Sequence, residues 1–318
     1  MSKMTFIVLI FILFTGINSC TTSVEDPVTE LPPSENFDSH NGTWNTDGTK
    51  ILFQHTDLSG SIPQQQQLWI YNSETDERDK VFDGPSLNPD WSPDGQWIAF
   101  HSNSVPSNIY KFRSTDSTLV RLTGDGTPTE NYSNWHTIIA RWNPAGDEIL
   151  FTAGSSDENR GAVIMNSDGS DAEIVVPFAV GATWFPDGEQ IVYVNWDTDQ
   201  PAGRQRQLYM AQADGTNPEK LTDLDNSDYI SSPVVSPDGT KVAFLHRPGQ
   251  STDLYVLNLQ DKSIDRLTTL NNQGVAREPR WHPDGQKILF SVRDINVSRR
   301  LYTIQPSSRE IKAVFPEL

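Results

Sequence analysis

The sequence predicts an all-β protein, a six-bladed β-propeller with four antiparallel strands in each blade. A phrase of the type Trp-Ser-Pro-Asp-Gly occurs six times, and its glycines stand 47, 51, 42, 51 and 46 residues apart. That period is typical of a propeller or solenoid repeat. An apolar triplet such as Ile98-Ala-Phe100 follows every phrase at the same offset. Six similar units with several short strands each indicate blades that pack radially around an axis.

The repeated phrase predicts a tight reversal between the first two strands of each unit. Pro fixes φ at the second turn position, Asp suits the third, and Gly takes the positive φ that follows. In three copies one residue departs from the phrase: Thr46 replaces Pro, Ala145 replaces Asp and Val235 replaces Trp. We expect locally weaker blades there, with no change of architecture. The copies span Trp44–Gly48, Trp91–Gly95, Trp142–Gly146, Trp184–Gly188, Val235–Gly239 and Trp281–Gly285.

The remaining strands follow in a fixed order. The apolar triplets, rich in Ile, Val and Phe, suit a strand covered on both faces. Turn signals such as Asp168-Gly169 and a last strand such as Leu119–Leu122 complete each unit. The propeller is expected over residues 38–318 with all six strand sets complete, although residues 21–37 could supply a closing strand. Third strands are expected at 67–71, 108–112, 162–165, 207–210, 253–257 and 300–304.

These motifs carry a family resemblance. The Trp-Ser-Pro-Asp-Gly turn, followed by the Ile-Ala-Phe strand and then a Leu-Tyr strand, resembles the propeller repeat of the TolB family. Related propellers occur in prolyl oligopeptidases and oligogalacturonate lyases. The resemblance covers nearly all of the mature chain and implies the propeller fold. TolB itself carries an additional α/β domain for which we expect no room here, so its role in an envelope-spanning complex is not transferred.

The first residues predict export and lipidation. Lys3 precedes an apolar run from Phe6 to Phe14, which is too short to span a membrane but suits the core of a signal peptide. The run ends in Ile17-Asn-Ser-Cys20, which resembles the lipobox of bacterial lipoproteins, and Cys20 is the only cysteine. We expect a signal peptide over 1–19 and an acylated Cys20, with palmitate among the acyl groups.

Residues 20–37 are rich in Thr, Ser, Pro and acidic side chains, which predicts a flexible tether after the lipid. The expected location is the cell envelope, at the outer membrane, in either periplasmic or surface-exposed orientation. Glu25-Asp26 weakly resembles a surface-export signal of Bacteroidetes lipoproteins, but plain linker charge explains the pair more simply.

Charge limits the partners. A formal net charge of −18 and a pI near 4.6 argue against nucleic acid or an anionic membrane surface as ligand, because both require a basic face. His55, His101 and His246 follow the second strands of three blades but lack the clustered pattern of a metal site. We therefore expect no metal and no cofactor. For the oligomeric state we expect a monomer.

The propeller topology directs attention to one face. Connections from the second to the third strand and between blades emerge there and are long, whereas short turns occupy the other face, and binding residues favour long loops on rigid scaffolds. Aromatic candidates could stack on sugars or grip a peptide, and arginines near the axis could bind an anion such as a uronate or a carboxyl terminus. Alternatively, the aromatic rings pack under their own loops and the arginines pair with Asp90 and Glu278. The candidates are Tyr132, Trp135, His136, Arg141, Trp196, His246, Arg277 and Arg280.

Two functions fit these observations. The first is a non-enzymatic, lipid-anchored envelope protein that binds a protein or a glycan through the long-loop face. The second is a carbohydrate-active enzyme, a polysaccharide or oligosaccharide lyase, with its site in the axial pocket. The chain has no Gly-x-Ser-x-Gly nucleophile elbow and no phosphate-binding glycine loop, so no residue is assigned a catalytic role.

Overall fold

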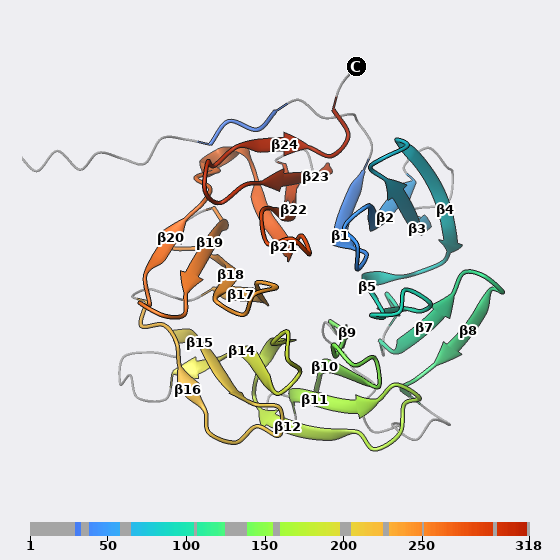
Figure 1. The fold of residues 1–318 in the computed structure, drawn as a ribbon, viewed down its shortest axis with the longest axis horizontal. Coiled ribbons are helices and arrows are strands. Elements are labelled where there is room, and N and C mark those ends of the chain that lie inside the picture. Colours follow the sequence, from blue (N-terminus) through green and yellow to red (C-terminus); the bar gives the residue numbers. More distant parts are fainter. Residues whose placement is uncertain are drawn as a thin grey trace, which may run out of the picture.

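A computed structural model confirms the six-bladed propeller. It describes residues 29–32, 38–57, 65–104, 107–124, 139–154, 160–197, 205–224, 229–249, 251–294 and 298–316. Six four-stranded antiparallel sheets form a ring, each with its first strand innermost (Figure 1). Every sheet contains four consecutive strands, so among the described residues no terminal strand is shared between the first and last blades.

The first three blades have these strands. Blade one contains β1 (Ser39–Trp44), β2 (Lys50–Asp57), β3 (Gln65–Asn72) and β4 (Glu77–Asp83). Blade two contains β5 (Leu87–Trp91), β6 (Ile98–His101), β7 (Ile109–Arg113) and β8 (Thr118–Arg121). Blade three contains β9 (Arg141–Trp142), β10 (Glu148–Gly154), β11 (Arg160–Asn166) and β12 (Glu173–Pro177).

The last three blades follow the same plan. Blade four contains β13 (Val180–Trp184), β14 (Gln190–Asp197), β15 (Gln205–Gln212) and β16 (Glu219–Lys220). Blade five contains β17 (Ile230–Val235), β18 (Lys241–His246), β19 (Asp253–Asn258) and β20 (Ile264–Arg266). Blade six contains β21 (Val275–Trp281), β22 (Ile288–Arg293), β23 (Arg299–Ile304) and β24 (Ile311–Ala313).

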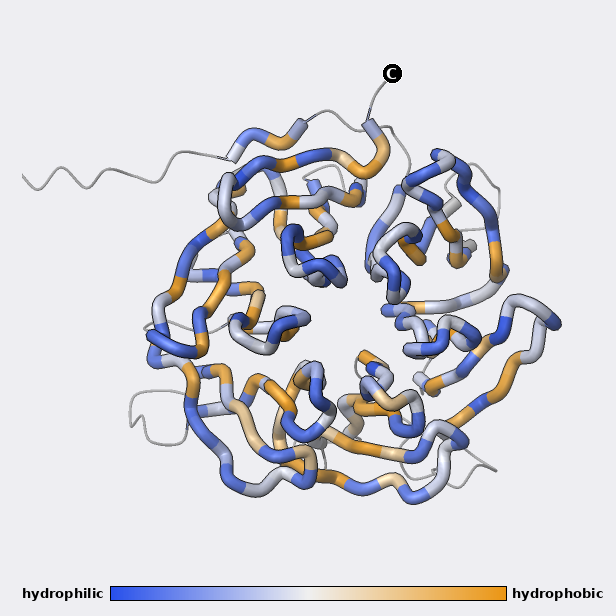
Figure 2. Tube along the Cα trace, viewed as in Figure 1, coloured by the Kyte–Doolittle hydropathy of each residue, from blue (hydrophilic) through white to orange (hydrophobic). Residues whose placement is uncertain are grey.

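The hydrophobic core lies between the blades. Its buried residues form six clusters, and each cluster joins two neighbouring blades. Figure 2 shows hydrophobic segments in the blades around the whole ring. The repeat Trp contributes to this packing, because Trp184 and Trp281 each donate their indole N–H to a first-strand carbonyl of the preceding blade, at 3.3 Å and 3.1 Å. The repeat therefore encodes the contact between blades as well as the turn.

The ring closes without a shared strand. Phe315, just after β24, is 1% exposed and packs in the cluster between blades six and one. Its ring centroid lies 5.3 Å from that of Phe53 and 5.1 Å from that of Tyr71, both in blade one. Asp38 also accepts a hydrogen bond of 2.9 Å from the backbone N–H of Arg299. Side-chain packing thus holds the first and last blades together.

Other residues compensate for each departure from the repeated phrase. Thr46 donates its hydroxyl proton to the carbonyl of Pro93 in the next blade, at 2.9 Å. Beside Ala145, the side-chain oxygen of Asn143 accepts three backbone N–H groups of the turn.

Val235 lies in a cluster with Phe185, a 6% exposed residue at a turn position that is polar in the other five copies. The architecture is therefore unchanged, as predicted, and the larger Phe185 packs where the smaller Val235 replaces Trp.

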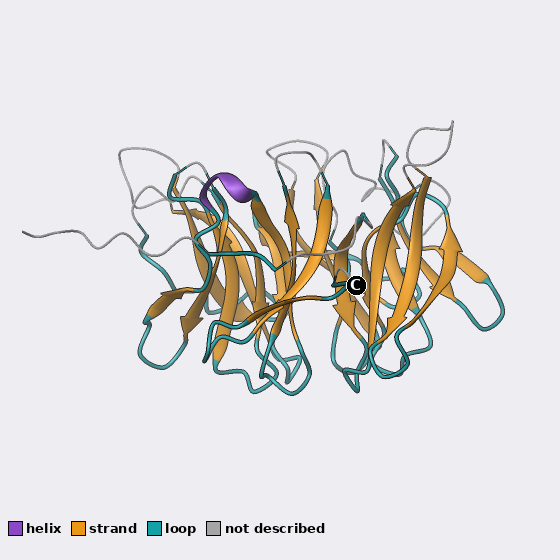
Figure 3. Ribbon diagram, turned by 90° about the horizontal axis from the view of Figure 1, so that it is seen from above, coloured by secondary structure: helices purple, strands orange, loops and turns teal. Residues whose placement is uncertain are grey.

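The tight turns share one face of the disc (Figure 3), as predicted, whereas most of the expected long loops lie outside the described residues. The tight turns lie on one side, and the short 3-10 helix η2 (Asn271–Gln273), between blades five and six, lies on the other (Figure 3). Two residues of the expected tether contact this junction. Thr29 donates its backbone N–H to Thr269 and accepts from Gln273, and Leu31 packs against the core cluster of blades five and six. The described residues contain no helix long and apolar enough to cross a membrane.

Candidate functional site

Five of the six innermost strands share an irregularity at the same position. Each contains a register shift against the second strand, and the residue three places before the phrase's first residue has a positive φ. A bulge with a left-handed residue turns side chains away from the regular pleat and is over-represented next to functional sites. The positive-φ residues are Asn41, Asn88, Gly181, Ser232 and Glu278.

The bulge residue has an amide or carboxyl side chain in three adjacent blades: Asn41 in blade one, Asn88 in blade two and Glu278 in blade six. Asn41 donates to the side chain of Gln54 at 2.9 Å, and the amide of Asn88 lies 3.1 Å from His101 Nε2. Glu278 accepts a bond of 3.3 Å from the hydroxyl of Ser291. In blades four and five the equivalent residues are a glycine and a serine. The polar side chains around the axis are therefore concentrated in blades six, one and two.

Ionisable side chains of four blades lie on the inner strands or beside them, and we call them the axial cluster: His40, Asp90, Arg141, Arg277, Glu278, Arg280 and Arg299. Arg141 of blade three interacts electrostatically with Asp90 and with Glu278 of blade six. Blades three and six are opposite each other in the ring (Figure 1), so this interaction requires side chains that extend towards the axis. Glu278 also interacts with Arg277 and Arg299.

Both carboxyl groups of the axial cluster have raised pKa values. Burial raises the pKa of Asp90 to about 6, against the attraction of Arg141 and a hydrogen bond from the backbone N–H of Trp142. Burial also raises the pKa of Glu278, although Arg277 and the Ser291 bond oppose the shift. Protein surrounds both groups on most sides, yet each keeps part of its surface accessible. Because water still reaches both carboxyl groups, their desolvation is incomplete, which limits how far burial raises the two pKa values.

Three arginines of the axial cluster have few partners. Arg141 is 8% exposed, and among the described residues its guanidinium donates only to the carbonyl of its neighbour Ala140, at 2.7 Å. Arg280 occupies the equivalent position in blade six, and its guanidinium donates to no described residue except Pro279, also at 2.7 Å. The guanidinium of Arg277 donates to no described residue, and the Nε atoms of Arg277 and Arg280 are buried with no partner in the described part of the chain. Buried donors are normally satisfied, so these groups require an explanation.

His40 adds another buried donor. Burial and the nearby Arg299 hold the pKa of His40 well below its ordinary value, so the ring is neutral. Its Nε2 atom lies 2.6 Å from the guanidinium of Arg299, which is always a donor, so Nε2 accepts and the proton resides on Nδ1. Nδ1 is buried and has no partner. The axial cluster thus presents unpaired N–H groups from both an imidazole and several guanidiniums.

The structure describes some of the predicted site residues, and the others lie outside the described residues. Arg141, Arg277 and Arg280 lie on the inner strands, as expected. Trp196 lies one residue before the end of β14, on the long-loop side, and the guanidinium of Arg206 lies 4.8 Å from its ring centroid. His246 is 4% exposed and packs edge-on against Tyr255. Tyr132, Trp135, His136 and Cys20 lie outside the described residues.

Two other described histidines, His55 and His101, contact polar groups of neighbouring residues. His101 lies within hydrogen-bond distance of Asn88, Ser102 and Ser107, and burial lowers its pKa to about 4. His55 contacts the carbonyl of Asp38 at 2.8 Å. In the part of the chain that the structure describes, no group of three His, Cys, Asp or Glu side chains is arranged to hold a metal ion.

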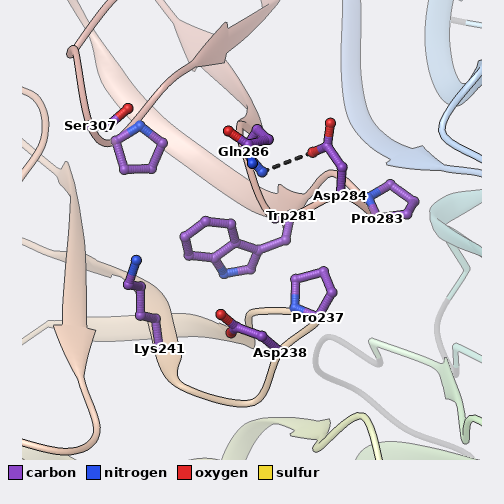
Figure 4. A pocket seen from close by; sticks show the side chains of 10 residues that line it. Pro237, Asp238, Lys241, Trp281, Pro283, Asp284, Gln286 and Ser307 are labelled. Atoms are coloured by element: carbon purple, nitrogen blue, oxygen red, sulfur yellow. Dashed lines mark hydrogen bonds between the residues drawn. The ribbon is translucent and has the colours of Figure 1, made fainter.

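A separate pocket of about 510 Å³ lies on the turn face between blades five and six (Figure 4). Pro237, Trp281, Pro283 and Pro306 are among the residues that line it. Trp281 is 7% exposed and bonded to Val234, so it belongs mainly to the blade interface. This pocket contains none of the residues predicted for the site, and its described walls include no unpaired buried cation. The axial cluster is therefore the stronger candidate site.

Sequence reasoning missed His40 and Arg299. A signal for His40 was present, because His40 and Arg277 both lie four residues before the Trp of their repeat, and Arg141 and Arg280 both lie one residue before it. Alignment of the repeats on the Trp therefore identifies the positions that supply most of the axial cluster. Arg299 begins β23 in a third strand, so no such offset marks it.

Comparison with known proteins agrees with this fold. Residues 188–316 match the family model described as the TolB beta propeller domain. The Tol-Pal system protein TolB of Alcanivorax borkumensis is 42% identical over 59 residues, which is 18% of this chain and 13% of that protein. An uncharacterized protein of Agrobacterium fabrum is 24% identical over 51% of this chain and 57% of its own length. The chain therefore spans less than two thirds of the curated relatives it matches.

Solved structures show the same architecture. TolB of Acinetobacter baumannii superposes with a TM-score of 0.67 at 18% identity, covering 84% of this chain and 63% of that one. An oligogalacturonate lyase of Vibrio parahaemolyticus superposes with a TM-score of 0.59 at 16% identity, covering 91% and 96%. These identities establish the fold and leave the activity open. The chain is a six-bladed β-propeller similar to that of TolB, and residues 188–316 match the TolB beta propeller domain.

Proposed function

We propose that this chain is a lipid-anchored protein of the cell envelope whose propeller, without catalysis, binds a protein or glycan partner through its long-loop face. The observation that carries the proposal is the axial cluster, whose buried donors have no partner within the described residues. Arg277 and Glu278 lie near the start of β21 and Arg299 begins β23, so all three lie towards the strand ends that are remote from the tight turns. A TolB-like propeller is compatible with such a role, and a protein ligand is the first choice.

The expected anchor adds a geometric consequence. Thr29 is bonded to the junction of blades five and six, so residues 21–28 alone connect it to Cys20. The nine extended Cα–Cα steps from Cys20 to Thr29 reach about 32 Å at most. An acyl group on Cys20 would therefore hold this edge of the propeller, on the side of η2, close to the bilayer. The outer membrane is the proposed site of attachment, with the propeller in the periplasm or at the cell surface.

Affinity capture from detergent-solubilised envelope tests the proposal. The chain offers a matched pair of substitutions: Trp196 on the long-loop side and Trp97 beside a tight turn, each half-buried under an arginine at 4.8 Å and 4.7 Å. We expect Trp196→Ala to lose a partner that wild type and Trp97→Ala retain. Cys20→Ala should release the protein from the membrane without abolishing capture. Equal capture by both Trp variants would contradict the assignment of the binding face.

A carbohydrate-active enzyme, a polysaccharide or oligosaccharide lyase, is the second candidate. The grouping of His40, Arg277, Glu278 and Arg299 near one axis favours it, since acid–base groups must reach one reacting atom. It ranks second because the neutral His40 already accepts from Arg299 through Nε2. Loss of viscosity of a polygalacturonate solution on addition of the Cys20→Ala protein, with no partner captured, would reverse this order.

A further inference from the structure

We propose that the axial cluster binds the carboxylate of a peptide C-terminus, held by the guanidiniums of Arg141 and Arg277. This inference deepens the proposed function, because it identifies the chemical group that a protein partner presents to the axis. It rests on donors that the fold places there and leaves without partners.

The first argument is the imbalance between donors and acceptors. Arg141, Arg277 and Arg280 each carry five N–H donors, yet within the described residues they make only two hydrogen bonds, both to the carbonyl of the preceding residue. Two of their Nε atoms and the Nδ1 atom of His40 are buried without a partner. Leaving such groups unsatisfied costs free energy, which a carboxylate that accepts from them would recover.

The second argument is charge. The axial cluster contains four guanidiniums and two carboxyls, whereas the whole chain carries a formal charge of −18. Neither Asp90 nor Glu278 forms an ion pair with Arg141, Arg277 or Arg280 among the described residues. A locally cationic site inside an acidic protein attracts an anion to the axis and disfavours approach elsewhere on the surface.

The third argument is access. Arg141 is nine-tenths buried and preorganised by its bond to Ala140. Asp90, Arg277, Glu278 and Arg280 keep part of their surface accessible, so solvent reaches the cluster. The carboxyls beside the arginines can accept the N–H groups of a peptide whose terminal carboxylate faces the guanidiniums.

The inner strands also favour a peptide over an acidic sugar. Their only Phe, Tyr or Trp residues are those of the repeated phrase, and these pack in or against the cores between blades. No flat aromatic ring on a described inner strand is therefore free to stack on a sugar face.

Calorimetric titration of the full chain in mild detergent tests the site. The probes are N-acetyl-dialanine, its C-terminal amide, and galacturonate. We expect the acid to bind at least about tenfold more tightly than the amide, and Arg141→Gln and Arg277→Gln each to weaken acid binding at least about tenfold. Arg277→Lys should fall between, because it keeps the charge but loses the planar fork.

The control is Arg113→Gln, which removes the same charge from a surface arginine paired with Asp116 and should leave binding unchanged. Circular dichroism and thermal midpoints identify any variant that fails to fold, and the comparison of acid with amide on wild type remains decisive in that case. Equal binding of acid and amide, no binding of the acid, or binding of galacturonate in its place would overturn the inference.

The outcome is separable from that of the proposed function. Capture of a partner that depends on Trp196 but not on Arg277, together with no binding of the acid, would retain the proposed function and refute this site. Binding of the acid without capture of any partner would retain this site and refute the proposed function.

Discussion

The blade interfaces and the axial cluster are built from the same six repeats, yet the repeats agree in one region and differ in the other. At the interfaces each repeat supplies the same kinds of residue, and the one substitution of Trp, Val235, lies beside the larger Phe185. At the axis the backbone bulge recurs in five blades, but its side chains range from Gly181 to Glu278. The interfaces therefore carry the fold, and the axial positions are free to carry recognition.

The axis itself has a charged part and an uncharged part. The inner strands of blades six, one and two carry His40, Asp90, Arg277, Glu278 and Arg280, and blade three adds Arg141. The inner strands of blades four and five contain no charged residue. Charge on four adjacent blades and none on the other two suits a directional ligand, whose polar end binds on the charged part of the ring.

The largest expected effect is at the interface that closes the ring. Phe315→Ala should lower the free energy of unfolding by about 3 to 4 kcal/mol, because it leaves a cavity among Phe53, Tyr71 and Leu289. Chemical denaturation measures the change. Leu119→Ala, at a residue 48% exposed, is the control and should change stability by less than about 0.5 kcal/mol. Equal effects would mean that the last blade does not close the ring through Phe315.

The next effect tests the pairing of Phe185 with Val235. Phe185→Ser alone should cost about 2 to 3 kcal/mol, since it removes a 6% exposed ring from a packed cluster. Adding Val235→Trp recreates the pair Ser236 and Trp281 of the next interface and should recover at least about 1 kcal/mol. Denaturation of the single and double variants measures the coupling. Additive losses would show that the two positions do not compensate for each other.

A smaller effect is expected at the axis from pH. The pKa of Asp90 is raised from 3.8 to about 6 in the folded protein, so the folded state holds its proton more firmly than the unfolded state. Stability should therefore fall as pH rises from about 4 to 6 and stay level above that range. Asp90→Asn keeps an acceptor for the N–H of Trp142 and removes the buried charge.

This variant should be more stable than wild type by about 1 to 2 kcal/mol at pH 8, a figure reduced for the partial solvent contact of Asp90, and equal to it at pH 4. Denaturation at both pH values provides the check. A constant difference between the two proteins would show that Asp90 ionises normally.

The smallest effect on stability is expected for Arg141→Gln. Its guanidinium makes one hydrogen bond and no ion pair with a described residue, and burial lowers the pKa of Arg141 despite the attraction of Asp90 and Glu278. Because removing the buried charge also removes its desolvation cost, the free energy of unfolding should change by less than about 1 kcal/mol. A loss comparable to that of Phe315→Ala would place Arg141 in the scaffold. Such a result would remove the distinction between the two regions.

The fold followed from the sequence because turn chemistry and apolar triplets are local signals that recur at a fixed period. Compensation for Ala145 and Val235 was not predictable, since Asn143 acts through backbone geometry and Phe185 through the shape of a cavity between blades. The inner arginines were placed correctly. Whether they find carboxylate partners depends on the bulges and on distances across the ring, which no single repeat contains.

The most direct test of the central claim is to titrate N-acetyl-dialanine into Arg141→Gln and Phe315→Ala under conditions where both are folded. The account predicts that Arg141→Gln keeps its stability and loses at least about tenfold in affinity, whereas Phe315→Ala loses about 3 to 4 kcal/mol of stability and binds as wild type does. Affinity that falls in proportion to stability in both variants would contradict the separation of scaffold from axial site.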